Sequence, residues 1–224
     1  MYNIIMLDKK LQEKIANNLN SFNLFTLFKN VNFNLMDYKK PIFLMEKSQL
    51  KYINNANSVV VKQADKNLLE GLKMKSINEL TIIDCNITDD MLELYKDIKK
   101  ITLFMCEKIT DNGMKHLNNK ERVILDNIQI TDKGLSELSN VGTVQLIGVD
   151  DITDEGLCYL NCKNLYLEEC YSITDNKLNE LKTLESLKIK DCIKVTDKCI
   201  DYFPGMIKNE DSDEDIVYLF KMKK

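Results

Sequence analysis

The sequence has little of the chemistry that enzymes and metal sites need. It contains one histidine, His116, and only seven glycines in 224 residues. Its seven cysteines are spaced about one repeat apart for the most part, and the sequence offers no local metal-ligand pair of the C-x-x-C kind. No Gly-rich loop that could hold a phosphate group is present. We therefore predict a protein that is not an enzyme, with no catalytic residues, no metal and no cofactor.

Long apolar runs and concentrated positive charge are also missing. No stretch approaches the roughly 20 apolar residues that span a membrane. The apolar start of the chain ends at Asp8, which argues against a secretory signal. The net charge is −4, with acidic and basic residues interspersed, so no basic face for nucleic acid or membrane is indicated. We expect a cytoplasmic or nuclear protein that is not secreted and whose cysteines are thiols.

What the sequence does contain is one motif repeated six times between Ile77 and Phe203. Each copy reads apolar-x-x-apolar-x-apolar-x-x-Cys, followed by Ile-Thr-Asp and a short amphipathic run, with some substitutions. The Thr-Asp pairs begin at Thr88, Thr110, Thr131, Thr153, Thr174 and Thr196. Their offsets of 22, 21, 22, 21 and 22 residues are regular enough to indicate a repeat architecture.

Each copy combines the pattern of a strand with that of a helix. Leu80 and Ile82 alternate with their neighbours, which predicts a short strand with one set of side chains inside. The Thr-Asp pair supplies side-chain oxygens that can cap a helix start. Apolar residues four and seven positions after the Thr, such as Leu135 and Leu138, predict a short helix. One such unit cannot bury its apolar edge alone, so the units must stack into a solenoid.

The motif resembles the cysteine-containing subclass of leucine-rich repeats, whose units read L-x-x-L-x-L-x-x-C-x-x-I-T-D-x-G-L. Residues 184–197 are a near-complete copy, whereas Lys120 replaces the first leucine of another copy. The cysteine position is filled in turn by Cys85, Cys106, Ile128, Val149, Cys170 and Cys192. Because Ile and Val replace Cys there, a small buried apolar residue explains the position better than a metal or a disulfide. The resemblance implies an α/β solenoid with a curved parallel sheet inside and short helices outside.

The N-terminal segment has a different pattern. In residues 7–31 apolar residues recur at helical spacing. The pattern resembles an F-box, although Asp8 stands at its proline, Asn23 at its acidic position, and its tryptophan is absent. Its apolar positions are matched by Leu7, Leu11, Ile15, Leu19, Leu24 and Leu27. Membership of the F-box/LRR-repeat family would imply that these residues bind the small adaptor of a cullin-RING ubiquitin ligase.

We therefore expect four regions. Residues 1–45 are an F-box-like helical cap, 46–76 a linker with a degenerate capping repeat, 77–207 six leucine-rich repeats, and 208–224 an acidic loop with a closing strand. The resemblance implies a substrate-recognition subunit of an SCF-type E3 ubiquitin ligase, monomeric outside its complex. The alternative is a leucine-rich repeat scaffold whose N-terminal helices only cap the solenoid, as any solenoid requires.

The outward strand residues should line the concave face and bind a protein target. Several are apolar where an open face is ordinarily polar, and the last repeat carries two lysines. An apolar patch rimmed by charge indicates a protein partner, with aromatic residues as anchors, unless a terminal segment folds over it. The predicted partner-binding residues are Ile83, Phe104, Ile124, Ile147, Tyr166, Glu168, Lys188 and Lys190.

Overall fold

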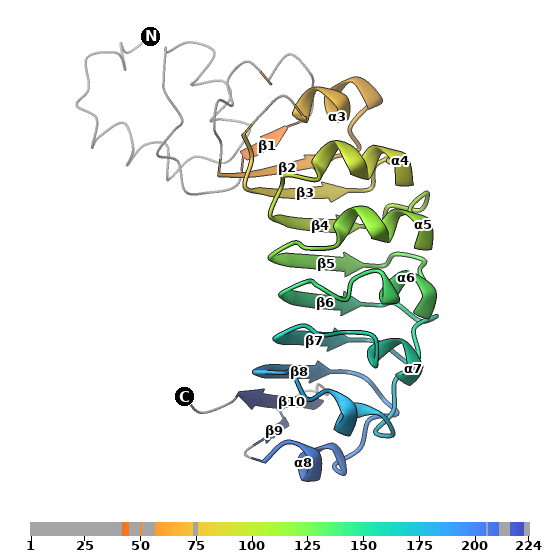
Figure 1. The fold of residues 1–224 in the computed structure, drawn as a ribbon, viewed down its shortest axis with the longest axis vertical. Coiled ribbons are helices and arrows are strands. Elements are labelled where there is room, and N and C mark those ends of the chain that lie inside the picture. Colours follow the sequence, from red (N-terminus) through yellow and green to blue (C-terminus); the bar gives the residue numbers. More distant parts are fainter. Residues whose placement is uncertain are drawn as a thin grey trace, which may run out of the picture.

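The computed structural model describes residues 42–44, 50, 57–73, 76–204, 206–210 and 216–221. Within them, eight parallel strands stack in chain order along the long axis of the molecule (Figure 1). They are β1 (Ile42–Leu44), β2 (Ser58–Lys62), β3 (Glu79–Ile83), β4 (Lys100–Phe104), β5 (Arg122–Asp126), β6 (Thr143–Ile147), β7 (Asn164–Glu168) and β8 (Ser186–Lys190).

Two more strands close the C-terminal end of this sheet. β9 (Ile207–Glu210) and β10 (Ile216–Lys221) follow the last repeat. β10 pairs antiparallel with β8, and β9 pairs antiparallel with β10, so the order is β1-β2-β3-β4-β5-β6-β7-β8-β10-β9. The expected closing strand is β10, which lies one strand in from the edge.

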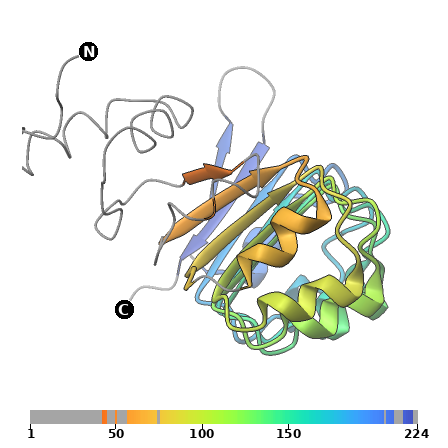
Figure 2. The same ribbon diagram turned by 90° about the horizontal axis from the view of Figure 1, so that it is seen from above.

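Short helices follow the strands and lie on one side of the sheet (Figure 2). They are α3 (Lys66–Leu72), α4 (Asp89–Leu92), α5 (Asp111–Met114), α6 (Asp132–Ser136), α7 (Asp154–Leu157) and α8 (Cys199–Tyr202). The 3-10 turns are η4 (Glu93–Tyr95), η5 (Lys115–Leu117) and η6 (Leu178–Glu180). The other face of the repeat sheet carries no helix among the described residues, and the predicted α/β solenoid is confirmed.

Side chains alternate along every strand from β3 to β8. The second and fourth residues of each strand are buried, and the other three are half-buried. Pairing aligns equal positions, so Leu80 lies beside Ile101 and Ile82 beside Leu103. The core is therefore two apolar columns that run through the stack, and the predicted strand alternation is confirmed. One residue of slip would turn both columns outward.

The array begins with a unit that lacks the Thr-Asp motif. β2 and α3 form this unit, and the Asp65 carboxylate accepts a hydrogen bond at the start of α3. β1 pairs with β2, and Leu44 and Leu50 both belong to the buried core. Residues of the range 42–72 thus cover the edge of the first Thr-Asp repeat.

Two predicted regions fall outside the described residues. One is the F-box-like segment with Leu7, Leu11, Ile15, Leu19, Leu24 and Leu27. The other is residues 211–215 of the predicted acidic loop, whose first residues, Asn209 and Glu210, belong to β9 instead. The adaptor-binding role of the first region stays a prediction.

A row of left-handed residues turns the chain away from the sheet. The residue after each strand from β2 to β8 has a φ between 48° and 57°. From β2 to β7 its N–H donates to the last carbonyl of the next strand, as Met105 does to Asp126 at 3.0 Å. Only Gly148 among the seven is a glycine, and a left-handed conformation is unfavourable for side chains such as that of Met105. This repeated inter-strand bond holds the turn in place.

The aspartate of each of the first five Thr-Asp pairs binds the next repeat, a role that the sequence did not reveal. From Thr110 on, the Thr side chain accepts from the backbone N–H two residues later, as Thr153 does from Glu155 at 3.3 Å, whereas Thr88 makes no such bond. The Asp132 carboxylate instead accepts from the Thr153 N–H at 2.8 Å and from its hydroxyl at 2.7 Å. The same pair of bonds joins Asp89 to Thr110, Asp111 to Thr131, Asp154 to Thr174, and Asp175 to Thr196. We call this series the Asp–Thr ladder.

The ladder also explains the glycine of the I-T-D-x-G-L motif. A Cβ on Gly156 would lie 2.1 Å from Asp132 Oδ1, and one on Gly134 would lie 2.4 Å from Asp111 Oδ1. The glycine makes room for the carboxylate of the preceding repeat. At the end of the ladder, Asp197 pairs with Lys208 at 3.0 Å, just beyond the last repeat.

Truncating a core side chain in the middle of the array should be costly. Leu146→Ala should lower the free energy of unfolding by about 2–5 kcal/mol, because Leu146 is fully buried between two repeats. The neighbouring Gln145→Ala, on the open face, should lower it by less than about 1 kcal/mol. Urea denaturation measures both, and equal losses would contradict the strand register.

The ladder predicts energetic coupling between Asp132 and Gly156. Asp132→Ala should cost about 1–3 kcal/mol, because two hydrogen bonds to a carboxylate are lost. Gly156→Ala alone should also cost about 1–3 kcal/mol, since the new methyl group displaces that carboxylate. In the double variant the second cost should largely vanish, so the double-mutant cycle should give a coupling of about 1 kcal/mol or more. Additive losses would show that the carboxylate is not what requires the glycine.

Candidate functional site

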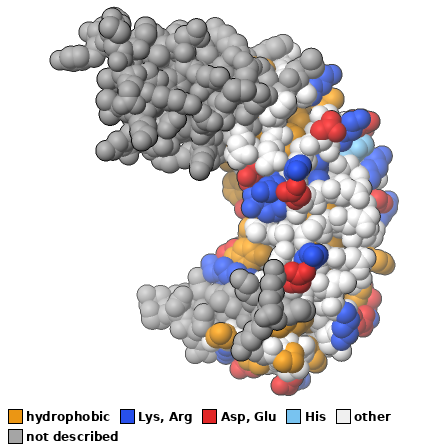
Figure 3. All heavy atoms as spheres, turned by 60° about the vertical axis from the view of Figure 1, so that its left-hand side comes forward, with side chains coloured by type: hydrophobic (Ala, Val, Ile, Leu, Met, Phe, Trp, Pro, Cys, Tyr) orange, Lys and Arg blue, Asp and Glu red, His pale blue; other side chains and the backbone are white. Residues whose placement is uncertain are grey.

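The open face of the sheet is the candidate binding surface. On each repeat strand the first, third and fifth residues point to this face, and in-register pairing arranges them in three columns. From β3 to β8 all of these residues are half-buried, and basic, acidic and apolar side chains lie side by side on the hollow side of the molecule (Figure 3). We call this surface the concave face.

The predicted apolar residues lie close together but do not form an unbroken column. Ile83 and Phe104 are neighbours in the fifth position of β3 and β4. Asp126 takes the same position on β5, before Ile147 on β6. Ile124, in the middle column, bridges this gap as a diagonal neighbour of Phe104 and Ile147. Burial raises the pKa of Asp126, and the side-chain hydrogen bond from Asn127 opposes that rise.

Tyr166, Glu168, Lys188 and Lys190 form one bonded cluster at the C-terminal part of this face. The Tyr166 hydroxyl donates to Glu168 Oε2, and Lys190 Nζ donates to Glu168 Oε1 at 2.9 Å. Lys188 Nζ lies 4.5 Å from the centre of the Tyr166 ring, a cation–π contact. Burial alone would raise the pKa of Glu168, but the bonds from Tyr166 and Lys190 lower it. Tyr166 is thus held in place by its neighbours.

A second charged group, at the N-terminal part, was not found from the sequence. Arg122 on β5 pairs with Glu79 on β3 across the intervening strand, which carries Lys100 in the same column. Arg122 Nε is the one buried side-chain nitrogen or oxygen of the described residues that has no hydrogen-bond partner. The sequence did offer a reason to single out this residue, because Arg122 is the only arginine in the chain.

The geometry decides the fold type: parallel strands lie on the inside, short helices lie on the outside, and two apolar columns run through the repeats. The chain has the fold of a leucine-rich repeat solenoid. No family model matches the sequence, and no curated protein sequence matches it.

A solved structure with a similar fold is one chain of the crystal structure of the Rad7 and Elc1 complex in yeast. The TM-score is 0.59 at 19% sequence identity, over 84% of this chain and 54% of that chain. This chain therefore matches about half the length of that protein. At this identity the likeness concerns the fold.

The cysteines of the repeat position are buried thiols. Cys106 Sγ lies 3.5 Å from the Phe104 carbonyl, and Cys170 Sγ lies 3.5 Å from that of Leu146. Burial raises the pKa of Cys106 to about 11, so its thiol stays protonated. Within the described ranges no group of three or more His, Cys, Asp and Glu side chains could hold a metal ion. None of the helices in that part of the chain is long and apolar enough to cross a membrane.

Lys120 is a buried lysine at a position where the repeat has leucine. Only 3% of it is exposed. Its ammonium donates to three carbonyls of the preceding repeat, at the end of η4 and just after it: those of Tyr95 (3.0 Å), Lys96 (3.3 Å) and Ile98 (2.6 Å). The Tyr95 hydroxyl in turn donates to the Leu69 carbonyl at 2.8 Å. Burial lowers the pKa of Lys120 to about 8, against a smaller opposing effect of Asp97.

The buried lysine predicts a specific pH dependence. Unfolded lysine titrates at 10.5, so charged Lys120 destabilises the fold below about pH 8, and this destabilisation disappears as the pH rises toward 10.5. We compare the wild type with Lys120→Met, which keeps every other titrating group. Between pH 7 and pH 10 the free energy of unfolding of the wild type should rise by about 1–3 kcal/mol relative to that of the variant. Urea denaturation at each pH measures both proteins. If the difference in free energy of unfolding between them stays constant over this pH range, the three carbonyls keep the lysine charged.

Proposed function

We propose that this chain is a non-enzymatic protein-binding repeat protein, and that it serves as a substrate-recognition subunit of an SCF-type E3 ubiquitin ligase. The concave face holds the target protein. The F-box-like residues 7–31 bind the small adaptor that links F-box proteins to the cullin.

The open concave face carries the first part of this proposal. A strand face with contiguous half-buried apolar side chains and charged groups at both ends suits a protein partner. Ile83, Phe104, Ile124 and Ile147 supply the apolar part. The fold is also the one seen in the complex of Rad7 with Elc1, in which two proteins associate.

The start of the array supports the second part. If residues 7–31 were only a cap, the first repeat would need them to cover its edge. β1 and Leu50 already lie against the opening unit made by β2 and α3, and Leu44 is buried there. This arrangement favours an F-box over a cap, because residues 42–72 already supply capping structure. The cap-only scaffold remains the competing proposal.

Adaptor binding separates the two. The full chain should co-purify with a recombinant F-box adaptor, and the double variant Leu11→Asp and Ile15→Asp should lose that binding because it places charges on the apolar helical register. The control Gln12→Asp adds a charge to the same segment outside that register and should retain binding. Far-ultraviolet circular dichroism shows whether the repeat array stays folded. If the full chain does not bind the adaptor, the proposed ligase role is wrong and the cap-only scaffold is the better proposal.

A further inference from the structure

We propose that the concave face takes an acidic protein segment that carries an apolar side chain between its carboxylates. This inference rests on the proposed function, because it names the chemical class of the target.

The sign of the charge on the concave face is opposite to that of the whole chain. The chain has a net charge of −4. Its outward strand positions from β2 to β8 carry five cations against three anions. The cations are Lys62, Lys100, Arg122, Lys188 and Lys190, and the anions are Glu79, Asp126 and Glu168. A surface of one sign on a protein of the other sign attracts complementary partners.

The anions of the face are largely occupied within the molecule. Glu79 binds Arg122, and Glu168 accepts from both Tyr166 and Lys190. Asp126, the remaining carboxyl group, accepts a hydrogen bond from the Asn127 side chain at 2.8 Å.

Three cations, in contrast, have no carboxylate contact within the described residues. Lys62 and Lys100 form no ion pair there, and Lys188 contacts the Tyr166 ring. The lysines are therefore the charges left for a partner. Since exposed lysine pairs are weak individually, an apolar anchor is needed for affinity.

The spacing of the lysines fits an extended segment. Lys100 lies on β4 and Lys188 on β8, four strands apart. Neighbouring strands are about 4.8 Å apart, so the separation is roughly 19 Å, which about six extended residues would span. Ile124 on β5 and Ile147 on β6 lie on the strands in between, and Phe104 lies at the other end of β4 from Lys100. A segment with acidic ends and an apolar centre matches this order.

Arg122 adds a second reason to expect a carboxylate. Its pairing with Glu79 leaves Nε without an acceptor, and a buried donor without a partner is unfavourable. A carboxylate from a partner that competes with Glu79 would draw the guanidinium toward solvent and relieve that unmet bond. Arginine binds carboxylates through two parallel hydrogen bonds, which favours the exchange.

A displayed library of random peptides tests this inference on the full-length protein. The enriched peptides should carry Asp or Glu on either side of an aromatic or aliphatic residue. A synthetic copy of the most enriched peptide is then titrated by fluorescence anisotropy. Its affinity should fall roughly tenfold with Lys100→Glu and severalfold with Lys188→Gln.

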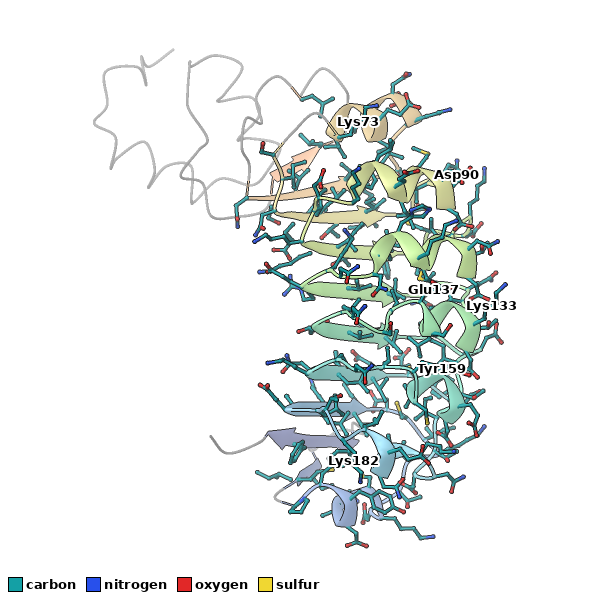
Figure 4. The ribbon with its side chains drawn as sticks, viewed as in Figure 1. Lys73, Asp90, Lys133, Glu137, Tyr159 and Lys182 are labelled. Carbon is teal, nitrogen blue, oxygen red and sulfur yellow. The ribbon has the colours of Figure 1, made fainter. Side chains whose placement is uncertain are left out.

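The matched controls lie outside the strand columns. Lys133→Glu, on α6, and Lys182→Gln, just after η6, make the same charge changes at exposed residues away from the strand columns (Figure 4). Both should leave the peptide affinity unchanged. Thermal denaturation of all four variants verifies that they are folded.

Three outcomes would overturn the inference. One is enrichment of basic or uncharged peptides, or of none. Another is an equal loss of affinity in the control variants. The third is that single-stranded DNA displaces the acidic peptide and that the binding of this DNA depends equally on Lys100. That result would make the concave face a phosphate-binding surface.

Failure here is distinguishable from failure of the proposed function. Loss of the acidic preference with adaptor binding intact leaves the ligase role standing with a different target class. If adaptor binding is absent but the preference for acidic peptides is present, the ligase role is wrong, and the concave face is still a binding surface for acidic segments.

Discussion

Each repeat of this protein buries its apolar side chains against the repeats before and after it, and the whole architecture depends on that stacking. A single strand and a helix of one or two turns cannot form a core. In-register pairing places Leu80 beside Ile101 and Ile82 beside Leu103, and the same positions continue to β8, so the two core columns grow by one layer per unit. The ends are then the weak points. Here β1 with α3 and β10 with β9 cover them.

Polar contacts between repeats fix the register of each repeat against the next, which apolar packing alone does not determine. Apolar columns tolerate small slips along the strand direction, whereas the Asp–Thr ladder requires each carboxylate to meet one threonine of the next repeat. The left-handed turn after each strand sets the same register at the end of the sheet. Gly156 shows how the polar contacts depend on the packing between repeats. Its lack of a side chain allows the Asp132 carboxylate to reach Thr153.

The solenoid leaves one face of its sheet for recognition. Helices occupy one side, and the outward strand residues on the other side are separated from the core by the alternation of the strand. Substitutions there can change charge and shape while the buried columns stay intact, which is why a repeat array can change its partner without changing its fold. The anions on that face have hydrogen-bond or ion-pair partners within the molecule, whereas three of its lysines pair with no carboxylate in the part of the chain that the structure describes. The face therefore has a chemical preference as well as a shape.

The sequence by itself determined the repeat, the strand alternation and the residues that line the concave face. Period-two patterns and a spacing of 21 or 22 residues depend only on local geometry, and stacking then follows because neighbouring units carry equal patterns. Tertiary structure decided the rest. The bond from Asp132 to Thr153, the pair of Glu79 with Arg122 and the carbonyls around Lys120 join different repeats, and which rotamer meets which acceptor depends on how those repeats pack. A periodic sequence specifies which positions face each other, but the contacts of individual polar side chains exist only once the stack has formed.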